Sequence, residues 1–99
     1  LCPTFTFCAT AESVALVGAT PVLVDVDPET FNIDVASLKS GIATAKAEGL
    51  KPKAVIPVDL FGLPADHDAI AEIAAADDLF ILDDAAQGFG GIYKGRAVG

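Results

Sequence analysis

Short apolar runs alternate with longer helix-like segments along the chain, and three of these runs end in an acidic residue. Residues 22–27, 53–59 and 79–83 are rich in β-branched and other apolar side chains, and their length is typical of strands. The third begins with four apolar residues in a row, a pattern typical of a strand buried on both faces inside a parallel sheet. Because Pro57 lacks the N–H that a central strand needs, we place it near the carboxyl end of its strand.

Three other segments have the composition and spacing of helices, at about residues 11–17, 35–48 and 65–76. Thr10 is the candidate N-cap of the first helix and Asp34 of the second, because short polar side chains accept hydrogen bonds from the free N–H groups of a first turn. The first helix has almost no polar face, so we expect it to be well buried.

The order of these elements predicts an α/β fold. The connections between the strands are too long for hairpins, so we expect parallel strands joined by helical crossovers. Residues 88–96 are rich in glycine and are predicted to form a loop. This segment has neither a G-x-G-x-x-G sequence between a strand and a helix nor a Walker lysine, so it gives little support for a phosphate-binding role.

The composition raises the question of what covers the sheet. Hydrophobic residues make up 53% of the 99 residues and charged residues only 20%. This apolar excess must be buried by helices on both faces of the sheet, by another part of the same polypeptide, or by a second subunit. The chain begins at Leu1 and stops at Gly99, just after a turn-like segment, so we expect it to be a segment of a longer protein.

The charge excludes two classes of partner. A net charge of −8 repels both the phosphates of nucleic acids and anionic membrane surfaces. Cys2 and Cys8 do not have the spacing of a metal-binding motif, and we expect them to be free thiols. No apolar run approaches the ~18 residues of a membrane span, and we expect a cytoplasmic protein.

Candidate chemistry is concentrated at the end of the third predicted strand, in Asp83, Asp84 and Gln87. Ligands of open α/β sheets bind outside the carboxyl ends of the strands. Successive side chains of a strand point to opposite faces, so at most one of the two acids is expected to meet a given ligand. A carboxylate and an amide close together can hold a partly cationic heterocycle. The alternatives are a solvated acid for Asp84 and a loop-capping amide for Gln87.

Several stretches, in order along the whole chain, match one family. They are Pro3–Phe7 with Ala9–Ala11, Gly18–Val22, Val24–Asp27, Asn32–Asp34, Ala54–Val58, Phe61–Gly62, Pro64–Asp66, Asp84–Gln87, and Tyr93–Gly95 with Val98–Gly99. On these residues the chain resembles the DegT/DnrJ/EryC1/StrS family of pyridoxal-phosphate-dependent aminotransferases, which act on nucleotide-linked keto sugars. The resemblance covers essentially all of residues 1–99, so it is more specific than any single motif.

The resemblance implies a three-layer α/β fold, with the mostly parallel sheet of the large domain of aspartate-aminotransferase-like (type I PLP) enzymes. Residues 1–99 would form part of this cofactor-binding domain, and the catalytic-lysine segment and the C-terminal small domain would lie outside them. No catalytic residue is therefore assigned within the segment, because none of its lysines is at the position of the family's Schiff-base lysine. We expect the 99 residues alone to be inactive.

The resemblance also implies three residues that bind the cofactor, pyridoxal 5'-phosphate. Asp84 corresponds to the carboxylate that pairs with the pyridinium nitrogen, Gln87 to the residue that hydrogen-bonds the ring oxygen, and Phe7 to the aromatic residue that stacks on the ring. An ionised acid is needed because it keeps the nitrogen protonated and the ring an electron sink. For Phe7, ordinary core packing is the favoured interpretation on the sequence alone. No metal ligand is implied.

Two positions depart from the family's pattern, and a third carries the single histidine of the chain. Asp83 stands where relatives usually carry Glu, and we expect it to point away from the cofactor. Asp59 stands where many relatives carry His, which leaves substrate contacts at that strand end open. His67 follows in the first turn of the third predicted helix, and we interpret it as a surface residue and not as an acid or base.

The resemblance implies a parent protein that transfers an amino group, from glutamate, to a nucleotide-linked keto sugar and works as a homodimer. One alternative is a free-standing flavodoxin-like or receiver-like module in which Asp25, Asp27 and Asp59 bind a divalent cation. Another is a non-catalytic regulatory member of the same family that has lost the lysine.

Overall fold

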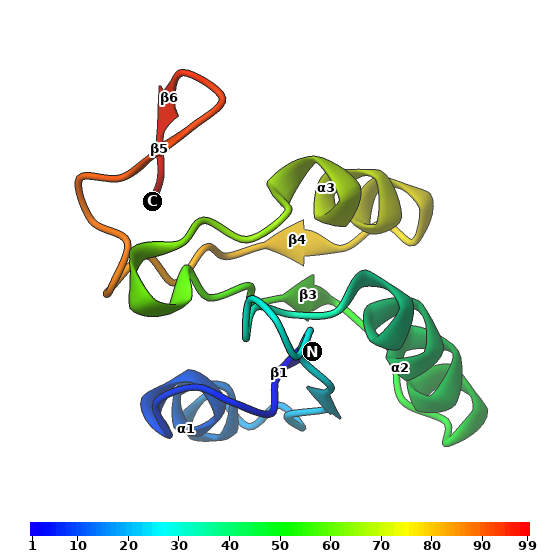
Figure 1. Ribbon diagram of the computed structural model, residues 1–99. Helices are drawn as coiled ribbons and strands as arrows, with labels where there is room; N and C mark the ends of the chain where they lie inside the picture. Colours follow the sequence, from blue (N-terminus) through cyan, green and yellow to red (C-terminus); the bar gives the residue numbers. More distant parts are fainter.

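The computed structural model describes residues 1–99 and contains three α-helices and six short strands (Figure 1). In chain order these are β1 (Cys2–Pro3), α1 (Ala9–Leu16), β2 (Leu23–Val24), α2 (Val35–Ala47), β3 (Ala54–Val55), a 3-10 turn at Leu60–Gly62, α3 (His67–Ala76), β4 (Phe80–Ile81), β5 (Ile92–Tyr93) and β6 (Arg96–Ala97). The alternation of strands and helices is as predicted, except that β1 and the β5–β6 pair were not expected.

Four of the strands form one parallel arrangement in the order β2–β1–β3–β4. The β1–β2 and β3–β4 pairs are parallel. Leu1 joins the two pairs, because its amino group donates to the carbonyl oxygen of Ala54 at 2.8 Å and its own carbonyl oxygen accepts from the N–H of Ile56 at 2.8 Å. The prediction of parallel strands is therefore confirmed.

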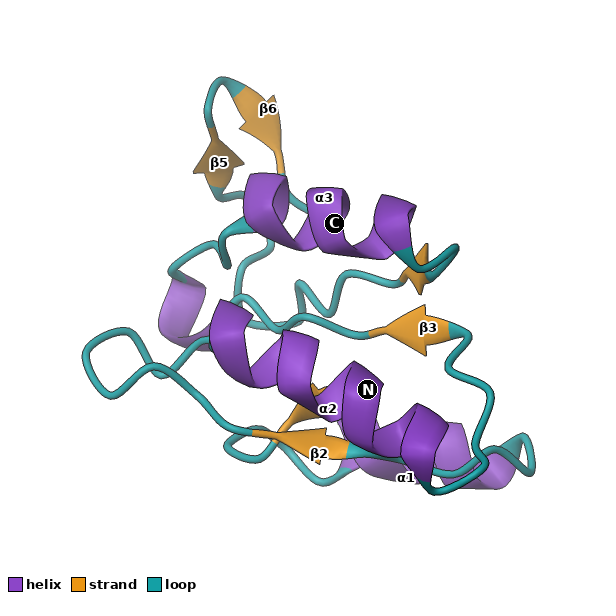
Figure 2. Cartoon of the chain, turned by 90° about the vertical axis from the view of Figure 1, so that its right-hand side faces the viewer, coloured by secondary structure: helices purple, strands orange, loops and turns teal.

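The direction in which the chain adds strands to the sheet changes at β1. It steps from β1 to β2, then returns to β3 on the other side of β1. Because parallel crossovers are right-handed, steps in opposite directions place their helices on opposite faces. Accordingly, α1 lies on one side of the strands in Figure 1 and α2 and α3 lie on the other, in front of the strands in Figure 2. The carboxyl ends of β1 and β3 flank this switch point, where α/β proteins place their ligands.

The helices on the two faces begin differently. Asp34 caps α2 by accepting from the N–H of Ser37 at 2.6 Å, as predicted, and Asp66 caps α3 by accepting from the N–H of Ala69 at 3.2 Å. The N-cap residue of α1 is Cys8, whose side chain makes no capping hydrogen bond. The prediction that Thr10 caps α1 is wrong, because Thr10 lies inside the helix and its hydroxyl has another partner, described below.

The hydrophobic core lies between the sheet and the helices α2 and α3. Its buried members are Val24, Ile33, Leu38, Ile42, Val55, Ala65, Ile70, Ile73 and Ala74. Leu79 and Ile81 of the last predicted strand pack against this cluster, but Phe80 and Leu82 are 65% and 52% exposed. The prediction that this strand is buried on both faces is therefore wrong for the 99 residues.

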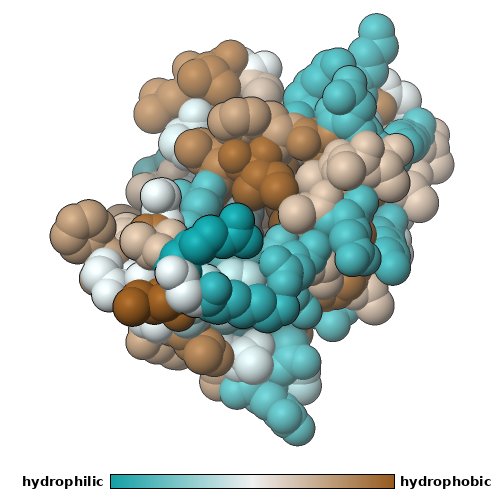
Figure 3. Space-filling model, turned by 90° about the horizontal axis from the view of Figure 1, so that it is seen from above, coloured by the Kyte–Doolittle hydropathy of each residue, from teal (hydrophilic) through white to brown (hydrophobic).

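The α1 face is largely open. Thr10 is the only buried residue of α1, and Leu16 and Val17 at its end are 86% and 80% exposed, so the expectation of a well-buried first helix is wrong as well. Seen from above, the side of α3 and the β5–β6 hairpin in Figure 1, the surface likewise shows hydrophobic regions next to hydrophilic ones (Figure 3). Many of the apolar side chains are therefore exposed, because within these 99 residues α1 is the only helix that covers that face.

Residues 88–96, predicted as a loop, contain part of an antiparallel hairpin. Tyr93 pairs with Arg96 across a turn in which Lys94 and Gly95 have φ of 47° and 82°, the left-handed values of a tight hairpin turn. Tyr93 donates its hydroxyl to the carboxylate of Asp66 at 3.2 Å, and Lys94 forms an ion pair with Asp68. These contacts hold the hairpin against the start of α3.

None of the helices combines the length and the apolar character needed to cross a membrane.

Candidate functional site

Side chains alternate along a strand, so those at the carboxyl ends of β3 and β4 form two separate neighbourhoods, one on each face of the sheet. The two strands stay paired up to their acids, since the N–H of Asp84 donates to the carbonyl of Pro57 at 2.9 Å and the N–H of Asp59 donates to the carbonyl of Asp84 at 3.1 Å. Val55, Asp59 and Asp83 face α3, and Ile56 and Asp84 face α1. The prediction that the two consecutive acids have different neighbours is confirmed.

Asp84 is held by the first turn of α1. Its Oδ2 accepts a hydrogen bond from the hydroxyl of Thr10 at 2.9 Å, and its Oδ1 accepts from the N–H of Ala86 at 3.3 Å. Thr10 is buried, and its hydroxyl also lies 3.1 Å from that of Thr6. An open hollow adjoins the carboxylate, lined by Ala9, Thr10, Ser13, Ile56, Leu82, Asp83 and Asp84. The interpretation of Asp84 as a freely solvated acid does not fit this environment.

Gln87 is anchored to the loop that follows β3. Its amide oxygen accepts from the N–H of Phe61 at 2.8 Å, and Phe61 has the unusual positive φ of 56°. This is the loop-capping contact considered as an alternative for Gln87. The contact occupies the amide oxygen and leaves the NH2 group to donate elsewhere.

Phe7 lies in the turn before α1, where its carbonyl oxygen accepts from the N–H of Thr10 at 3.1 Å. Its side chain is 72% exposed, so the interpretation as a core residue is wrong for this chain. Thr10 therefore connects two of the three predicted residues, because its backbone binds Phe7 and its hydroxyl binds Asp84.

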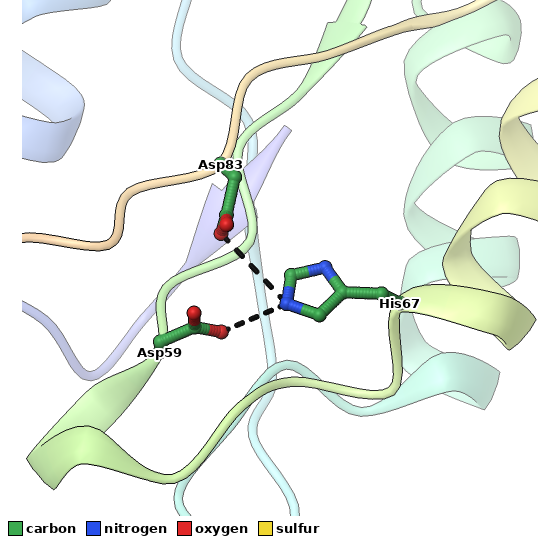
Figure 4. A group of neighbouring side chains, drawn as sticks. All are labelled: Asp59, His67 and Asp83. Carbon is green, nitrogen blue, oxygen red and sulfur yellow. Dashed lines mark hydrogen bonds and ion pairs between the residues drawn. The ribbon is translucent and has the colours of Figure 1, made fainter. Parts of the chain in front are cut away.

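The opposite neighbourhood brings together Asp59, His67 and Asp83 (Figure 4). The carboxylate of Asp59 is fully buried, and its Oδ1 lies 2.9 Å from Nε2 of His67. Oδ1 of Asp83 lies 3.9 Å from the same nitrogen. The side chain of His67 is only 20% exposed, so its interpretation as a surface residue is wrong. The missed signal is topological, because a right-handed crossover places the start of α3 beside the carboxyl ends of β3 and β4.

Burial sets the electrostatics of this cluster. Loss of solvation raises the pKa of Asp83, and the nearby carboxylate of Asp59 raises it further. The N–H of Gly99, which donates to Oδ2 of Asp83 at 2.9 Å, acts in the opposite direction on this pKa. The cluster therefore contains an acid whose charged form is disfavoured.

The alternative grouping of Asp25, Asp27 and Asp59 is not formed. Asp59 lies with His67 and Asp83 instead. Asp27 accepts hydrogen bonds from the backbone N–H groups of Thr30 and Glu29, which lower its pKa. The acids at these strand ends thus serve different local roles and do not form the cation-binding group that the receiver-like alternative requires.

Three aromatic residues meet at the carboxyl edge of the sheet, a cluster that no sequence pattern predicts. Phe5, Phe31 and Phe61 come from the loops after β1, β2 and β3, and their ring centroids are 5.5 to 6.4 Å apart. Phe31 and Phe61 both have positive φ, 60° and 56°. Non-glycine residues rarely adopt this conformation, so these loops are specifically shaped where the aromatic rings meet.

Comparison with known proteins places this geometry in a family. The chain is 49% identical over 94 residues to UDP-2-acetamido-2-deoxy-3-oxo-D-glucuronate aminotransferase of Pseudomonas aeruginosa, covering 95% of this chain and 24% of that protein. It is 50% identical over 95 residues to the pleiotropic regulatory protein of Geobacillus stearothermophilus, covering 96% of this chain and 24% of that protein. The chain therefore spans about a quarter of the length of these relatives.

The fold is also found among solved structures. The crystal structure of a DegT DnrJ EryC1 StrS aminotransferase from Brucella abortus matches with a TM-score of 0.88 and 58% sequence identity, covering 90% of this chain and 24% of that one. The predicted fold class, the α/β large-domain fold of type I PLP aminotransferases, is thereby confirmed. The family model for DegT/DnrJ/EryC1/StrS aminotransferases matches residues 1–99. The chain belongs to the DegT/DnrJ/EryC1/StrS aminotransferase family.

Proposed function

We propose that the full-length protein containing this chain is a PLP-dependent aminotransferase that transfers an amino group to a nucleotide-linked keto sugar. The observation that carries the proposal is the carboxylate of Asp84, fixed at the carboxyl end of β4 and next to an open hollow. The family depends on PLP, and its named relatives include aminotransferases of nucleotide sugars.

The residues around Asp84 fit the pyridine ring of this cofactor. Each oxygen of the carboxylate accepts one hydrogen bond, from Thr10 or from Ala86, and keeps a lone pair that can accept a cationic N–H. When bound, PLP supplies an electron-withdrawing pyridinium ring that accepts the electron pair released at the substrate carbon. In this proposal, Asp84 keeps the ring nitrogen protonated, and Thr10 fixes the orientation of the carboxylate.

Two further residues complete this wall of the site in the proposal. Gln87 donates its free NH2 group to the ring oxygen while its amide oxygen remains bonded to Phe61. Phe7 stacks on the ring, for which its side chain is available because it is 72% exposed. Residues 1–99 then provide part of the cofactor-binding large domain, and the lysine that binds the cofactor covalently comes from outside them.

The amino donor, the acceptor, the oligomeric state and the location in this proposal are carried over from the family. Glutamate is the amino donor, the acceptor is a keto sugar carried by a nucleotide, and the enzyme is a cytoplasmic homodimer. A homodimer also offers a way to bury part of the exposed apolar side chains of Phe80, Leu82 and Leu16.

The test uses the full-length protein loaded with PLP. We expect an absorbance band that borohydride removes, and transfer of the amino group of glutamate to a UDP-linked 3-keto sugar, followed by mass spectrometry. Asp84→Asn should lower kcat by about a hundredfold or more, because the electrostatic partner of the ring is lost. Asp25→Asn, a strand-end acid at β2, should keep the wild-type rate. A wild-type protein without the band, or an Asp84→Asn variant as active as wild type, would contradict the proposal.

A regulatory function is the second candidate, because a relative at 50% identity bears the name pleiotropic regulatory protein. The same experiment separates the two functions. A purely regulatory protein that has lost the lysine would give no borohydride-sensitive band and no amino transfer, even if it retained the fold. Amino transfer by the wild-type protein, abolished by Asp84→Asn, would favour the enzyme.

A further inference from the structure

The cluster of Asp59, His67 and Asp83 contains more acceptor atoms than its hydrogen bonds can satisfy. Oδ2 of Asp59 and Oδ1 of Asp83 are buried and have no hydrogen-bond partner. Nε2 of His67 carries at most one proton, and the nearer acceptor is Oδ1 of Asp59, which already accepts from the N–H of Ala65 at 2.8 Å. Buried polar atoms without a partner are rare and destabilising, so these oxygens call for an explanation.

We propose that Asp59, His67 and Asp83 bind a divalent transition-metal cation such as Zn²⁺ or Mn²⁺. The three side chains converge on one point, with both carboxylates directed toward the imidazole in Figure 4. One ligand atom from each lies within 4.8 Å of the others. One imidazole nitrogen and two carboxylate oxygens are a donor set that suits Zn²⁺ and related cations.

The distances agree with this assignment. Nε2 of His67 lies 2.9 Å from Oδ1 of Asp59 and 3.9 Å from Oδ1 of Asp83. Two ligand atoms of a tetrahedral Zn²⁺ are about 3.3 Å apart, given metal–ligand distances near 2.0–2.1 Å. The two observed separations lie on either side of this value, and the ligand atoms of the two carboxylates lie within 4.8 Å of each other, so side-chain shifts would bring the three ligand atoms to the spacing of a metal site.

The ligands are held in place by groups around them. Asp59 is oriented by the N–H of Ala65, and Asp83 by the N–H of Gly99. The ring of His67 stands edge-on to Tyr93, with centroids 5.2 Å apart. Such supporting contacts tune the affinity of metal sites. An open hollow bounded by His67, Asp83 and the β5–β6 hairpin gives a cation and its water ligands a path from solvent.

The site is separate from the proposed cofactor site. Asp83 points toward α3 and Asp84 points toward α1, so the cation and the cofactor would occupy opposite faces of the strand ends. A bound cation would connect the ends of β3 and β4 to the start of α3. Cation binding at this site does not depend on transamination, and its test measures cation binding and not amino transfer.

The first test is calorimetric titration of tag-free, metal-stripped full-length protein with Zn²⁺, with and without PLP. We expect one bound cation per chain in both cases. Asp83→Asn and His67→Phe should each weaken binding more than about tenfold, because even the loss of a supporting group outside the metal ligands costs roughly 10–100-fold in affinity. Asp68→Asn is the matched control, since this acid is next to His67 but pairs with Lys94, and it should not change the affinity.

A second measurement needs no variant. Crystals of the full-length protein grown with MnCl2 should show an anomalous-scattering peak between the three side chains. The proposal is overturned if no peak lies there, if the wild-type protein binds no Zn²⁺, or if the affinity is the same in Asp83→Asn and His67→Phe as in the wild type.

Discussion

The two faces of the β2–β1–β3–β4 sheet are formed by the same strands but are covered very differently. Helices α2 and α3 bury one face, where Leu38 and Ile70 are fully enclosed. On the other face α1 is mostly exposed, and Phe80 of β4 and Leu82 just after it remain 65% and 52% accessible. The contrast shows that the composition of the strands alone does not tell how completely a sheet is buried.

The same contrast continues into the chemistry at the strand ends. On the covered face, Asp59 and Asp83 are enclosed together with His67. On the open face, Asp84 is held by Thr10 and adjoins a hollow. Two consecutive aspartates thus have different environments because strand side chains alternate. The enclosed pair suits a small cation, and the open acid suits a larger ligand.

The largest effect is expected from truncating one leucine on each face. In the 99-residue chain, Leu38→Ala should lower the free energy of unfolding by about 2–5 kcal/mol, because it leaves a cavity in the core. Leu82→Ala should cost less than about 1 kcal/mol, because this side chain is already 52% exposed. Urea unfolding followed by circular dichroism measures both values.

Repeating the pair in the full-length protein sharpens the comparison. If the rest of the protein or a second subunit covers the open face, Leu82→Ala should there approach the cost of Leu38→Ala. Equal losses for the two variants already in the 99-residue chain would show that the faces do not differ as described.

A smaller effect is expected at the starts of the helices. Asp34→Ala should destabilise the chain by about 1 kcal/mol, within a range of roughly 0.5–2 kcal/mol, because it removes the cap of α2. Cys8→Ala at the start of α1 is the matched control and should have little effect, since Cys8 makes no cap hydrogen bond. The measurement is again urea unfolding. A larger loss from Cys8→Ala than from Asp34→Ala would reverse the assigned roles.

The smallest effect is expected outside both faces, at the exposed loop after β2. Hydrogen bonds from Thr30 and Glu29 lower the pKa of Asp27 in the folded chain, so its contribution to stability is present above the ordinary aspartate pKa of about 3.9. That contribution is lost as the pH falls through the lowered value. Asp27→Asn should therefore be slightly less stable than wild type near pH 7, and the difference should vanish in acid.

Urea unfolding at a series of pH values tests this expectation, with Asp25→Asn as the control for loss of a neighbouring exposed charge. A difference between wild type and Asp27→Asn that stays constant or grows as the pH falls would be inconsistent with the hydrogen bonds assigned to Asp27.

Most of the fold follows from local patterns in the sequence. The helical spacing and the Asp34 cap of α2 come directly from neighbouring residues, and so does the alternation that separates Asp83 from Asp84. Thr10 shows the limit of such patterns. It has a typical capping side chain, but its hydroxyl binds Asp84, 74 positions away in the chain. A tertiary contact therefore replaced the local one.

The candidate site divides in the same way. The motif at a strand end points to Asp84 and Gln87, and the family resemblance points to Phe7. The roles of all three residues toward the cofactor remain predictions. His67 was misjudged because its partners are eight and sixteen residues away, across a helix start and a strand end. The cluster of Phe5, Phe31 and Phe61 was also missed, since it depends on three loops and on two unusual backbone conformations.

The sequence by itself determined the three helices, the strands β2, β3 and β4, their parallel connection and the two acids that follow β4, because these depend on periodicity and on interactions between near neighbours. Only the tertiary structure decided which face is covered and which groups surround each acid. The reason is that the crossover direction, reversed at β1, places α1 on one face and α2 and α3 on the other, and this follows from the order of the strands in space.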